Sequence, residues 1–272
     1  MSCCRNHGKR IVIAIAILFV ALPVLAQKTA SPTCPSKPIV LALFEFGNLY
    51  RDGTGLDKDI SDIMAERSGC RFDVRVMQRQ YTWPALQDGS IDMTLSAVAL
   101  PERTAFSWAT PYLWMKYMVV LRKDVDSSIH SKADFIADPN LKLGTGHAYV
   151  HGRSYDEFVT QLRNIGRVVD VADTDRLFKM FKADRFQAVI STQIAYTSYL
   201  KDDIQADKVR IEDWSPGKPK DELNLLISKK NFTQDEARLW GELIKAMNAD
   251  GTLLRLLSKY VDQADAIKML AP

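Results

Sequence analysis

The sequence predicts an α/β protein of two lobes that are joined by two connecting segments. Segments typical of strands alternate with segments typical of helices along residues 39–228. Two strand–helix units precede a crossover near residue 115, and a second set of such units follows it. The polar segment 214–221 (WSPGKPKD) then returns the chain to the first set. We therefore expect two lobes with a cleft between them.

Residues 1–26 have the organisation of a secretory signal peptide. Three basic residues stand within the first ten, residues 11–25 are almost continuously apolar, and the small residue Ala26 ends the segment. The apolar run is shorter than the roughly 20 residues that a membrane-spanning helix needs, which argues against an uncleaved anchor. We expect a mature protein that begins at Gln27 and is located in the periplasm. The intact mass of the exported protein tests this, because retention of residues 1–26 would contradict it.

The mature chain has balanced charge and keeps two of the four cysteines. Loss of residues 1–26 lowers Lys plus Arg from 36 to 33, against 33 Asp plus Glu. A nucleic-acid partner favours a basic protein, so none is expected. Cys34 and Cys70 are an even number of cysteines in an oxidising compartment, and we expect them to form one disulfide.

The sequence carries no sign of a metal, a cofactor or a nucleophilic active site. Two cysteines do not make a zinc site, and no cluster of His and Asp accompanies them. The chain contains no P-loop, no dinucleotide-binding fingerprint and no serine-nucleophile motif. We therefore expect no metal and no cofactor.

Periodicity places the elements of the first set. Residues 39–43 (IVLAL) form a short apolar run typical of a buried strand, and residues 72–77 alternate as a strand does. Apolar residues recur at helical spacing between residues 56 and 69. Pro84 to Asp88 suits a short helix, and residues 91–95 suit a third strand.

The second set continues the alternation as far as a helical C-terminus. Strands are expected at 117–122, 141–145, 167–171, 187–190 and, after the linker, 223–228. Helices are expected after Ser131, at 153–164, after Asp173 and at 192–200. Thr233 and Glu236 form a capping box, so a further helix begins there, and a last helix follows Gly251.

Residues 84–112 (PALQDGSIDMTLSAVALPERTAFSWATPY) resemble the signature of the family-3 extracellular solute-binding proteins of ABC transporters. The segment TGLDKDISDIMAERSG is similar to the first helix of that family, and ADGTLLRLLSKYV is similar to its C-terminal helix. The resemblance extends over about residues 36–262. It implies a type II periplasmic binding protein, which has two doubly wound α/β lobes joined by a two-strand hinge and closes like a Venus flytrap.

The resemblance also implies domain bounds, partners and a role. Lobe 1 is expected at 36–114 plus 223–266, lobe 2 at 118–217, and the hinges at about 113–118 and 218–224. The expected function is that of a monomeric binding protein, not an enzyme, which takes a small carboxylate-bearing ligand such as an amino acid. The expected partner is the permease of an ABC importer.

Arg103 is the leading candidate for ligand binding. In the family that this chain resembles, the arginine of the Glu-Arg turn holds the α-carboxylate of the ligand. A guanidinium group suits this role because it is always charged and matches a carboxylate with two parallel hydrogen bonds. The alternative is a surface arginine that pairs with Glu102 or with solvent.

Other candidates lie where predicted strands end, because ligands bind at the carboxyl ends of strands in open α/β sheets. The loop after the first strand offers an apolar wall and one acceptor, and a loop in lobe 2 replaces a turn that donates backbone N–H groups in the family. The candidates are Glu45, Phe46, Tyr50 and Ser96 from lobe 1 and His147, Tyr149 and Thr192 from lobe 2. The alternative for each aromatic ring is a place in the core, and for His147 an exposed or structural role.

Two positions depart from the amino-acid-binding members of the family. Val98 stands where they have Ser or Thr at the carboxylate, and Thr192 stands where they have the Asp that pairs with the α-amino group. A buried ammonium group needs a counter-charge that a hydroxyl does not supply. We therefore expect a ligand without a standard α-amino group, or one whose amine reaches Glu45.

Two other functions remain open on the same scaffold. The resemblance extends to periplasmic cyclohexadienyl dehydratases, which would need a carboxylic acid in the cleft as general acid, and Glu45 is the candidate. A binding protein that feeds a receptor is the second alternative, and the sequence does not distinguish it from a transport protein.

Overall fold

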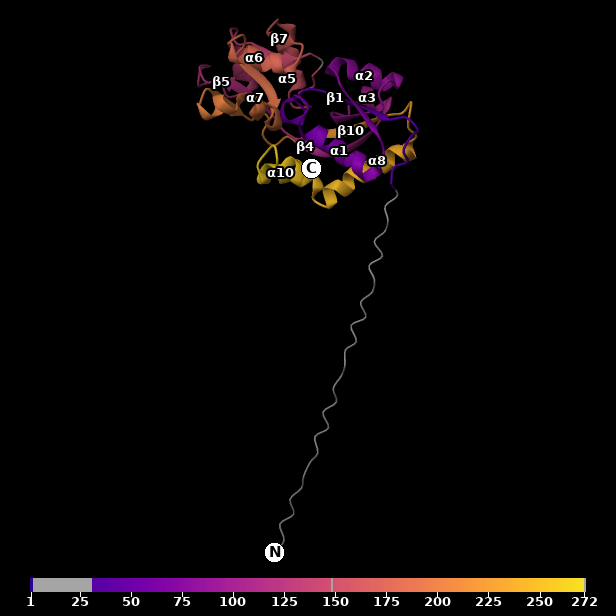
Figure 1. Ribbon diagram of the computed structural model, residues 1–272. Helices are drawn as coiled ribbons and strands as arrows, with labels where there is room; N and C mark the ends of the chain where they lie inside the picture. Colours follow the sequence, from indigo (N-terminus) through magenta and orange to yellow (C-terminus); the bar gives the residue numbers. More distant parts are fainter. Residues whose placement is uncertain (2–30, 148, 272) are drawn as a thin grey trace.

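Apart from Met1, the computed structural model describes residues 31–147 and 149–271, and these form two α/β lobes, each built on a five-stranded sheet (Figure 1). The strand order of the first sheet is β2-β1-β3-β10-β4, and that of the second is β7-β6-β8-β5-β9. The first sheet contains β1 (Ile39–Leu43), β2 (Phe72–Val76), β3 (Met93–Ala97), β4 (Ser107–Met115) and β10 (Asp221–Ser228). The second contains β5 (Tyr117–Arg122), β6 (Leu143–Gly146), β7 (Val168–Val171), β8 (Ala188–Thr192) and β9 (Val209–Glu212).

The two sheets share one plan. In the first, β1 pairs in parallel with β2 and β3, whereas β10 runs antiparallel to β3 and β4. In the second, β6 pairs in parallel with β7 and β8, whereas β5 runs antiparallel to β8 and β9. The chain passes from one sheet to the other between Met115 and Tyr117 and returns between Glu212 and Asp221.

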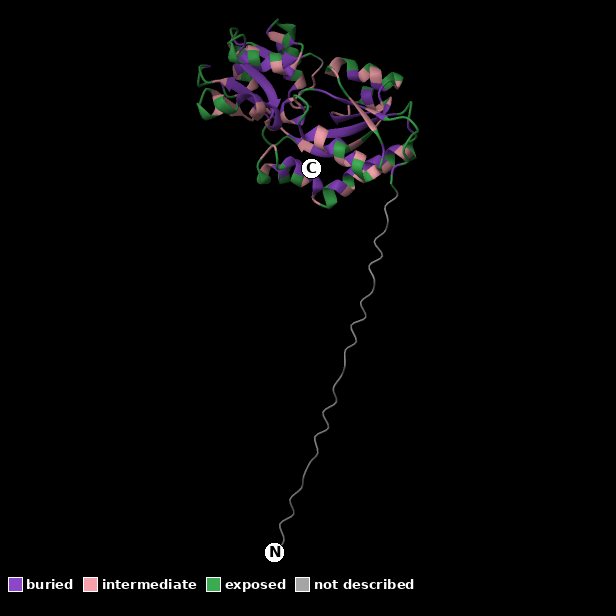
Figure 2. Cartoon of the chain, in the orientation of Figure 1, coloured by how far each residue is buried: buried purple, intermediate pink, exposed green. Residues whose placement is uncertain are grey.

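Helices cover both sheets, and their buried faces form the cores (Figure 2). The first lobe carries the 3-10 turn η1 (Gly47–Leu49), α1 (Leu56–Ser68), α2 (Arg79–Asp88), α3 (Pro101–Thr104), α8 (Gln234–Ala249), α9 (Thr252–Leu257) and α10 (Gln263–Met269). The second carries α4 (Lys132–Ala137), α5 (Asp156–Asn164), α6 (Thr174–Lys182) and α7 (Gln193–Gln205). Trp240 of α8 is fully buried against the first sheet, and Phe135 of α4 is fully buried in the second lobe.

Local sequence signals set several helix ends as expected. Ser131 and Asp173 each accept a hydrogen bond from the backbone N–H three residues ahead, so they cap α4 and α6. Thr233 and Glu236 form the capping box that begins α8.

The disulfide between Cys34 and Cys70 is confirmed. The two Cα atoms lie 5.1 Å apart, which is the usual separation for a disulfide. Cys34 precedes β1, Cys70 precedes β2, and these strands are parallel neighbours. The bond therefore lies where strands β1 and β2 begin, at the opposite end from the one where they finish.

Several elements differ from the sequence prediction, including helix α10, because no helix was expected after the one that follows Gly251. Strand β4 was not predicted, because it contains Pro111, which cannot donate to a ladder; β4 is an edge strand, where a proline is tolerated. The short polar edge strand β9 was also not predicted. Helix α2 begins at Arg79 rather than at Pro84, and this difference brings Arg79 into the site described next.

Candidate ligand-binding site

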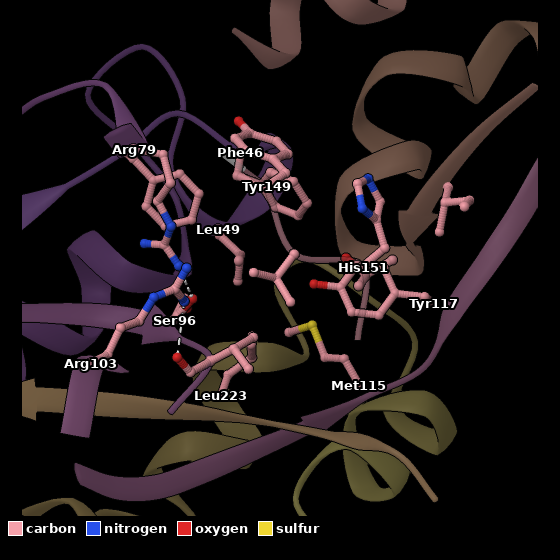
Figure 3. Close-up of a pocket in the computed structure, with 15 residues that line it drawn as sticks. Phe46, Leu49, Arg79, Ser96, Arg103, Met115, Tyr117, Tyr149, His151 and Leu223 are labelled. Atoms are coloured by element: carbon pink, nitrogen blue, oxygen red, sulfur yellow. Dashed lines mark hydrogen bonds between the residues drawn. The ribbon is translucent and has the colours of Figure 1, made fainter. Parts of the chain in front are cut away.

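A cavity lies between the two lobes, at the carboxyl ends of β1 and β3 and facing β8 across the gap (Figure 3). Its volume is about 40 Å³, which is room for only a few water molecules. Both lobes line it, with a largely apolar surface and two arginines. The lining residues are Phe44, Phe46, Leu49, Arg79, Ser96, Val98, Arg103, Met115, Tyr117, Tyr149, Val150, His151, Ile190, Thr192 and Leu223.

Arg103 reaches this cavity from the short helix α3. Its residue is only 6% exposed, and its Nη1 donates to the carbonyl oxygen of Val98 at 3.0 Å. The guanidinium carbon lies 3.7 Å from the centre of the Trp83 ring, which is the geometry of a cation–π contact. Burial lowers the pKa of Arg103 to about 10, so the group stays charged at neutral pH. A desolvated cation held in this way is a strong site for an anion.

Arg79, the first residue of α2, is a second cation in the same cavity. Its guanidinium carbon lies 3.7 Å from the centre of the Phe44 ring and 4.6 Å from that of Trp83. Its Nη2 donates to the carbonyl oxygen of Ser96 at 2.9 Å, whereas its buried Nη1 has no partner among the described residues. Burial, and then repulsion by Arg103, lowers the pKa of Arg79 to about 9.

A buried carboxyl group lies behind Ser96. The Ser96 hydroxyl donates to Asp57 Oδ1 at 2.7 Å, and the Tyr112 hydroxyl donates to the same oxygen at 3.4 Å. The Tyr112 oxygen also accepts the Ser96 backbone N–H at 2.9 Å. Ser96 has a φ of +49°, a left-handed conformation that is uncommon for a residue with a side chain. Asp57 and Tyr112 thus fix the conformation that directs the Ser96 carbonyl to Arg79.

Asp57 makes stability depend on pH. Burial raises the pKa of this carboxyl from 3.8 to about 7 in the folded protein, despite the opposing effects of Ser96 and Arg79. Between these values the folded state binds more protons than the unfolded state, so the free energy of unfolding falls as pH rises. The loss of stability is at most about 1.4 kcal/mol per pH unit for one group.

We therefore expect Asp57→Asn to gain stability relative to the wild type as pH rises from 4 to 7. Urea unfolding of both proteins across this range measures the difference. Asp62→Asn is the control, because Asp62 is an exposed partner of Lys58 on the same helix. Parallel pH profiles for the wild type and Asp57→Asn would contradict the prediction.

The second lobe supplies aromatic and neutral polar groups. The Tyr149 ring meets the Phe46 ring edge to face, with their centres 5.6 Å apart. The ring centres of His151 and Tyr117 are 6.3 Å apart, and His151 Nε2 lies 2.8 Å from Thr145 Oγ1. Burial lowers the pKa of His151 to about 4, so its imidazole is neutral at neutral pH. The cavity wall opposite the arginines is therefore uncharged.

The structure brings five of the candidate residues together at the cavity and leaves three outside. The five that line it are Phe46, Ser96, Arg103, Tyr149 and Thr192. Thr192 ends β8, and its buried Oγ1 has no hydrogen-bond partner among the described residues. Glu45 and His147 are exposed outside the lining set, and Tyr50 belongs to the core of the first lobe.

Sequence reasoning missed several lining residues. Arg79 was missed because Pro84 suggested too late a start for α2, and a start at Gln78 would have revealed it. Tyr117 and His151 lie on a predicted strand and in a loop, but no local pattern tells which side of a strand faces the other lobe. The other missed residues are Leu49, Met115, Val150, Ile190 and Leu223.

The described part of the chain has neither a metal-binding cluster nor a membrane-spanning helix. It contains no group of three or more His, Cys, Asp or Glu side chains placed to hold a metal ion. No helix within it has the length and hydropathy of a membrane span. The predicted signal peptide lies outside the described residues.

Solved structures of amino-acid-binding proteins share this fold. An ancestral arginine-binding protein bound to arginine is 22% identical, with a TM-score of 0.67 over 82% of this chain and 97% of that one. The arginine-, lysine-, histidine-binding protein ArtJ from Geobacillus stearothermophilus is 15% identical, with a TM-score of 0.68 over 82% and 95%. An ancestral amino acid-binding protein that is a precursor of cyclohexadienyl dehydratase is 20% identical, with a TM-score of 0.67 over 82% and 95%.

No curated protein sequence matches this chain significantly. The structural likeness establishes the fold of a type II periplasmic binding protein, with two lobes and a cavity between them. The sequence profile of the bacterial extracellular solute-binding proteins, family 3, matches residues 42–263. Because this span is most of the chain, the protein belongs to that family.

Proposed function

We propose that this solute-binding protein captures a small carboxylate-bearing molecule in the periplasm and delivers it to an ABC importer. The observation that carries the proposal is the buried, charged Arg103, which lines the cavity between the lobes. A guanidinium group in a desolvated cavity binds a carboxylate strongly and selects against neutral molecules. The family supports the importer as the receiving partner.

A screen by thermal shift tests this function. Organic acids, amino acids and amines are added singly, and the melting temperature is measured for each. A ligand that binds only the folded protein stabilises it by roughly 2.7 kcal/mol at a hundredfold excess over Kd. We expect stabilisation by carboxylates and none by amines that lack an acid group. Stabilisation by amines alone would contradict the proposal.

Nothing at the cavity favours catalysis over binding. None of the described residues that line it carries a carboxylic acid, and Glu45, the candidate general acid, lies outside the lining set. The buried Asp57 is held behind Ser96 by two hydroxyl groups. We therefore prefer transport to a dehydratase-like activity. Delivery of the ligand to a receptor instead of a permease would use the same binding site, so the cavity does not distinguish these two roles.

We propose that the two lobes open and close about the two connections. In this proposal lobe 1 is 36–114 plus 223–266, lobe 2 is 118–217, and the hinges are about 113–118 and 218–224. The crossings at Lys116 and after Glu212 support it, because few torsions need to change there. The small cavity supports it too, since a ligand of amino-acid size needs the lobes to separate before it enters.

Contacts across the gap support this proposal. The Thr174 hydroxyl donates to the carbonyl oxygen of Glu45 at 3.1 Å, and Phe46 packs on Tyr149. Ligand is expected to draw the open lobes together around itself, so small-angle scattering is expected to show a smaller radius of gyration with ligand than without it. An unchanged radius at saturation would argue against hinge closure.

Gly47 offers a matched test of closure. A Cβ at Gly47 would lie 2.6 Å from the Cα of Ala195 in the opposite lobe, so Gly47→Ala is expected to prevent full closure. The control is Gly53→Ala, because Gly53 also has a positive φ but a Cβ there would meet nothing within 4 Å. We expect ligand to reduce the radius of Gly53→Ala and to leave that of Gly47→Ala larger.

A further inference from the structure

We propose that the ligand carries two neighbouring negative charges, which Arg79 and Arg103 hold together. The inference rests on the proposed function and narrows it to a class of ligand. Both arginines enter one cavity from the same lobe, and Figure 3 shows them on the same wall with Ser96 beside them. Both guanidinium groups lie over the Trp83 ring, at 3.7 Å and 4.6 Å from its centre. Burial and then repulsion by Arg103 lower the pKa of Arg79, so the two positive charges lie near each other.

Neither guanidinium group is in direct contact with a carboxylate of the described residues. Within residues 31–147 and 149–271, neither Arg79 nor Arg103 forms a salt bridge, and their side-chain hydrogen bonds go to the carbonyl oxygens of Ser96 and Val98. Two buried donors, Arg79 Nη1 and Trp83 Nε1, lack partners in this part of the chain. Two like charges that share a desolvated wall repel each other and favour an anion that carries a charge for each.

Acidic side chains near the cavity are already engaged. Asp57 is bound by Ser96 behind the wall, and Glu102, next to Arg103, is exposed. Asp156 and Asp221 line a neighbouring cavity, where each accepts a backbone N–H from the second lobe, at 2.8 Å and 3.3 Å. The remaining wall consists of apolar and neutral groups. The site is thus built for a compact dianion with an apolar body and no ammonium group.

The spacing of the two cations selects among isomers. Because the two guanidinium groups lie near each other on one wall of the cavity (Figure 3), they match acid groups on adjacent atoms better than acid groups at opposite ends of a molecule. Phthalate and terephthalate differ only in this spacing, as do maleate and fumarate, and benzoate is the matching single acid. Phenyl phosphate tests whether the two negative charges of the ligand belong to one phosphate group instead of two carboxylates.

Calorimetry at a pH where every probe is fully ionised tests the inference. We expect phthalate and maleate to bind at least about tenfold more tightly than terephthalate, fumarate and benzoate, the difference expected for a second charge-assisted pair. Arg79→Gln is expected to remove that preference, so that phthalate and maleate bind this variant no more tightly than terephthalate and fumarate do. Arg75→Gln is the control, because Arg75 is exposed and pairs with Asp73 outside the cavity.

The outcomes separate this inference from the proposed function. The two-charge inference would be overturned if diacids with adjacent and with opposed acid groups bound equally well, or if Arg79→Gln kept the preference for adjacent groups. The proposed function would survive either result, provided that Arg103→Gln abolishes binding. Tight binding of phenyl phosphate without phthalate would assign the charges to a phosphate group. If no probe binds in a way that depends on Arg103, both proposals fail. The melting temperature of ligand-free Arg79→Gln is a second readout, expected at or above that of the wild type because one repelling charge is gone.

Discussion

Arg103→Ala is expected to weaken carboxylate binding at least roughly thirtyfold while the protein stays folded. Removing one partner of a charge-assisted pair from a desolvated cleft costs about 2–5 kcal/mol, and each 1.4 kcal/mol is about tenfold in affinity. The variant also loses the contact with Trp83 that orients the guanidinium group. Titration calorimetry of the folded variant with a ligand found in the screen measures the loss.

Arg75→Ala is the control for Arg103→Ala. Arg75 is an exposed arginine that pairs with Asp73 and lies outside the cavity lining. We expect wild-type affinity in this variant. Wild-type affinity in folded Arg103→Ala would remove Arg103 from the binding site, whatever the result for Arg75→Ala.

Loss of the Cys34–Cys70 disulfide is expected to lower the free energy of unfolding by roughly 3–4 kcal/mol, because it frees a loop of 36 residues in the unfolded chain. The bond lies at the amino-terminal edge of the first sheet, whereas the cavity lies where the strands end. We therefore expect ligand affinity to stay unchanged. Denaturant unfolding of a double Cys→Ala variant gives the energy, and calorimetry gives the affinity.

Reducing agent supplies the control for the disulfide. It should destabilise the wild type to the level of the double variant and should have no effect on the variant itself. If the wild type without reducing agent and the double variant had the same unfolding midpoint, a stabilising role for the disulfide would be contradicted. A large change in affinity would place the disulfide in communication with the cavity.

Much of the fold was predictable because local patterns of residues indicate most of its helices and strands. The run at 39–43 is β1, the helical spacing after Leu56 is α1, and the capping box at Thr233 begins α8. Strand β4 was not predictable in this way, because its stability comes from pairing with β10 along an edge that tolerates Pro111. Non-local pairing of this kind leaves little trace in the periodicity of one segment.

The site was predictable only in part, for the same physical reason. Arg103 was expected at the site because residues 84–112 resemble the family signature, and Ser96 because it follows the third predicted strand. Arg79 comes from a different helix, and both arginine side chains contact Trp83. Tyr149 reaches the same cavity from the second lobe, and no one-dimensional pattern encodes how two lobes face each other.

The most direct test of the account is calorimetry of the wild-type protein with the carboxylates found in the screen, followed by analysis of the recovered ligand by NMR. The account predicts one saturable site per chain, loss of the heat of binding in Arg103→Ala, and a ligand that is recovered unchanged. A ligand that binds equally well without Arg103, or one that is converted to a product, would contradict the assignment of this cavity as a binding site for a small carboxylate.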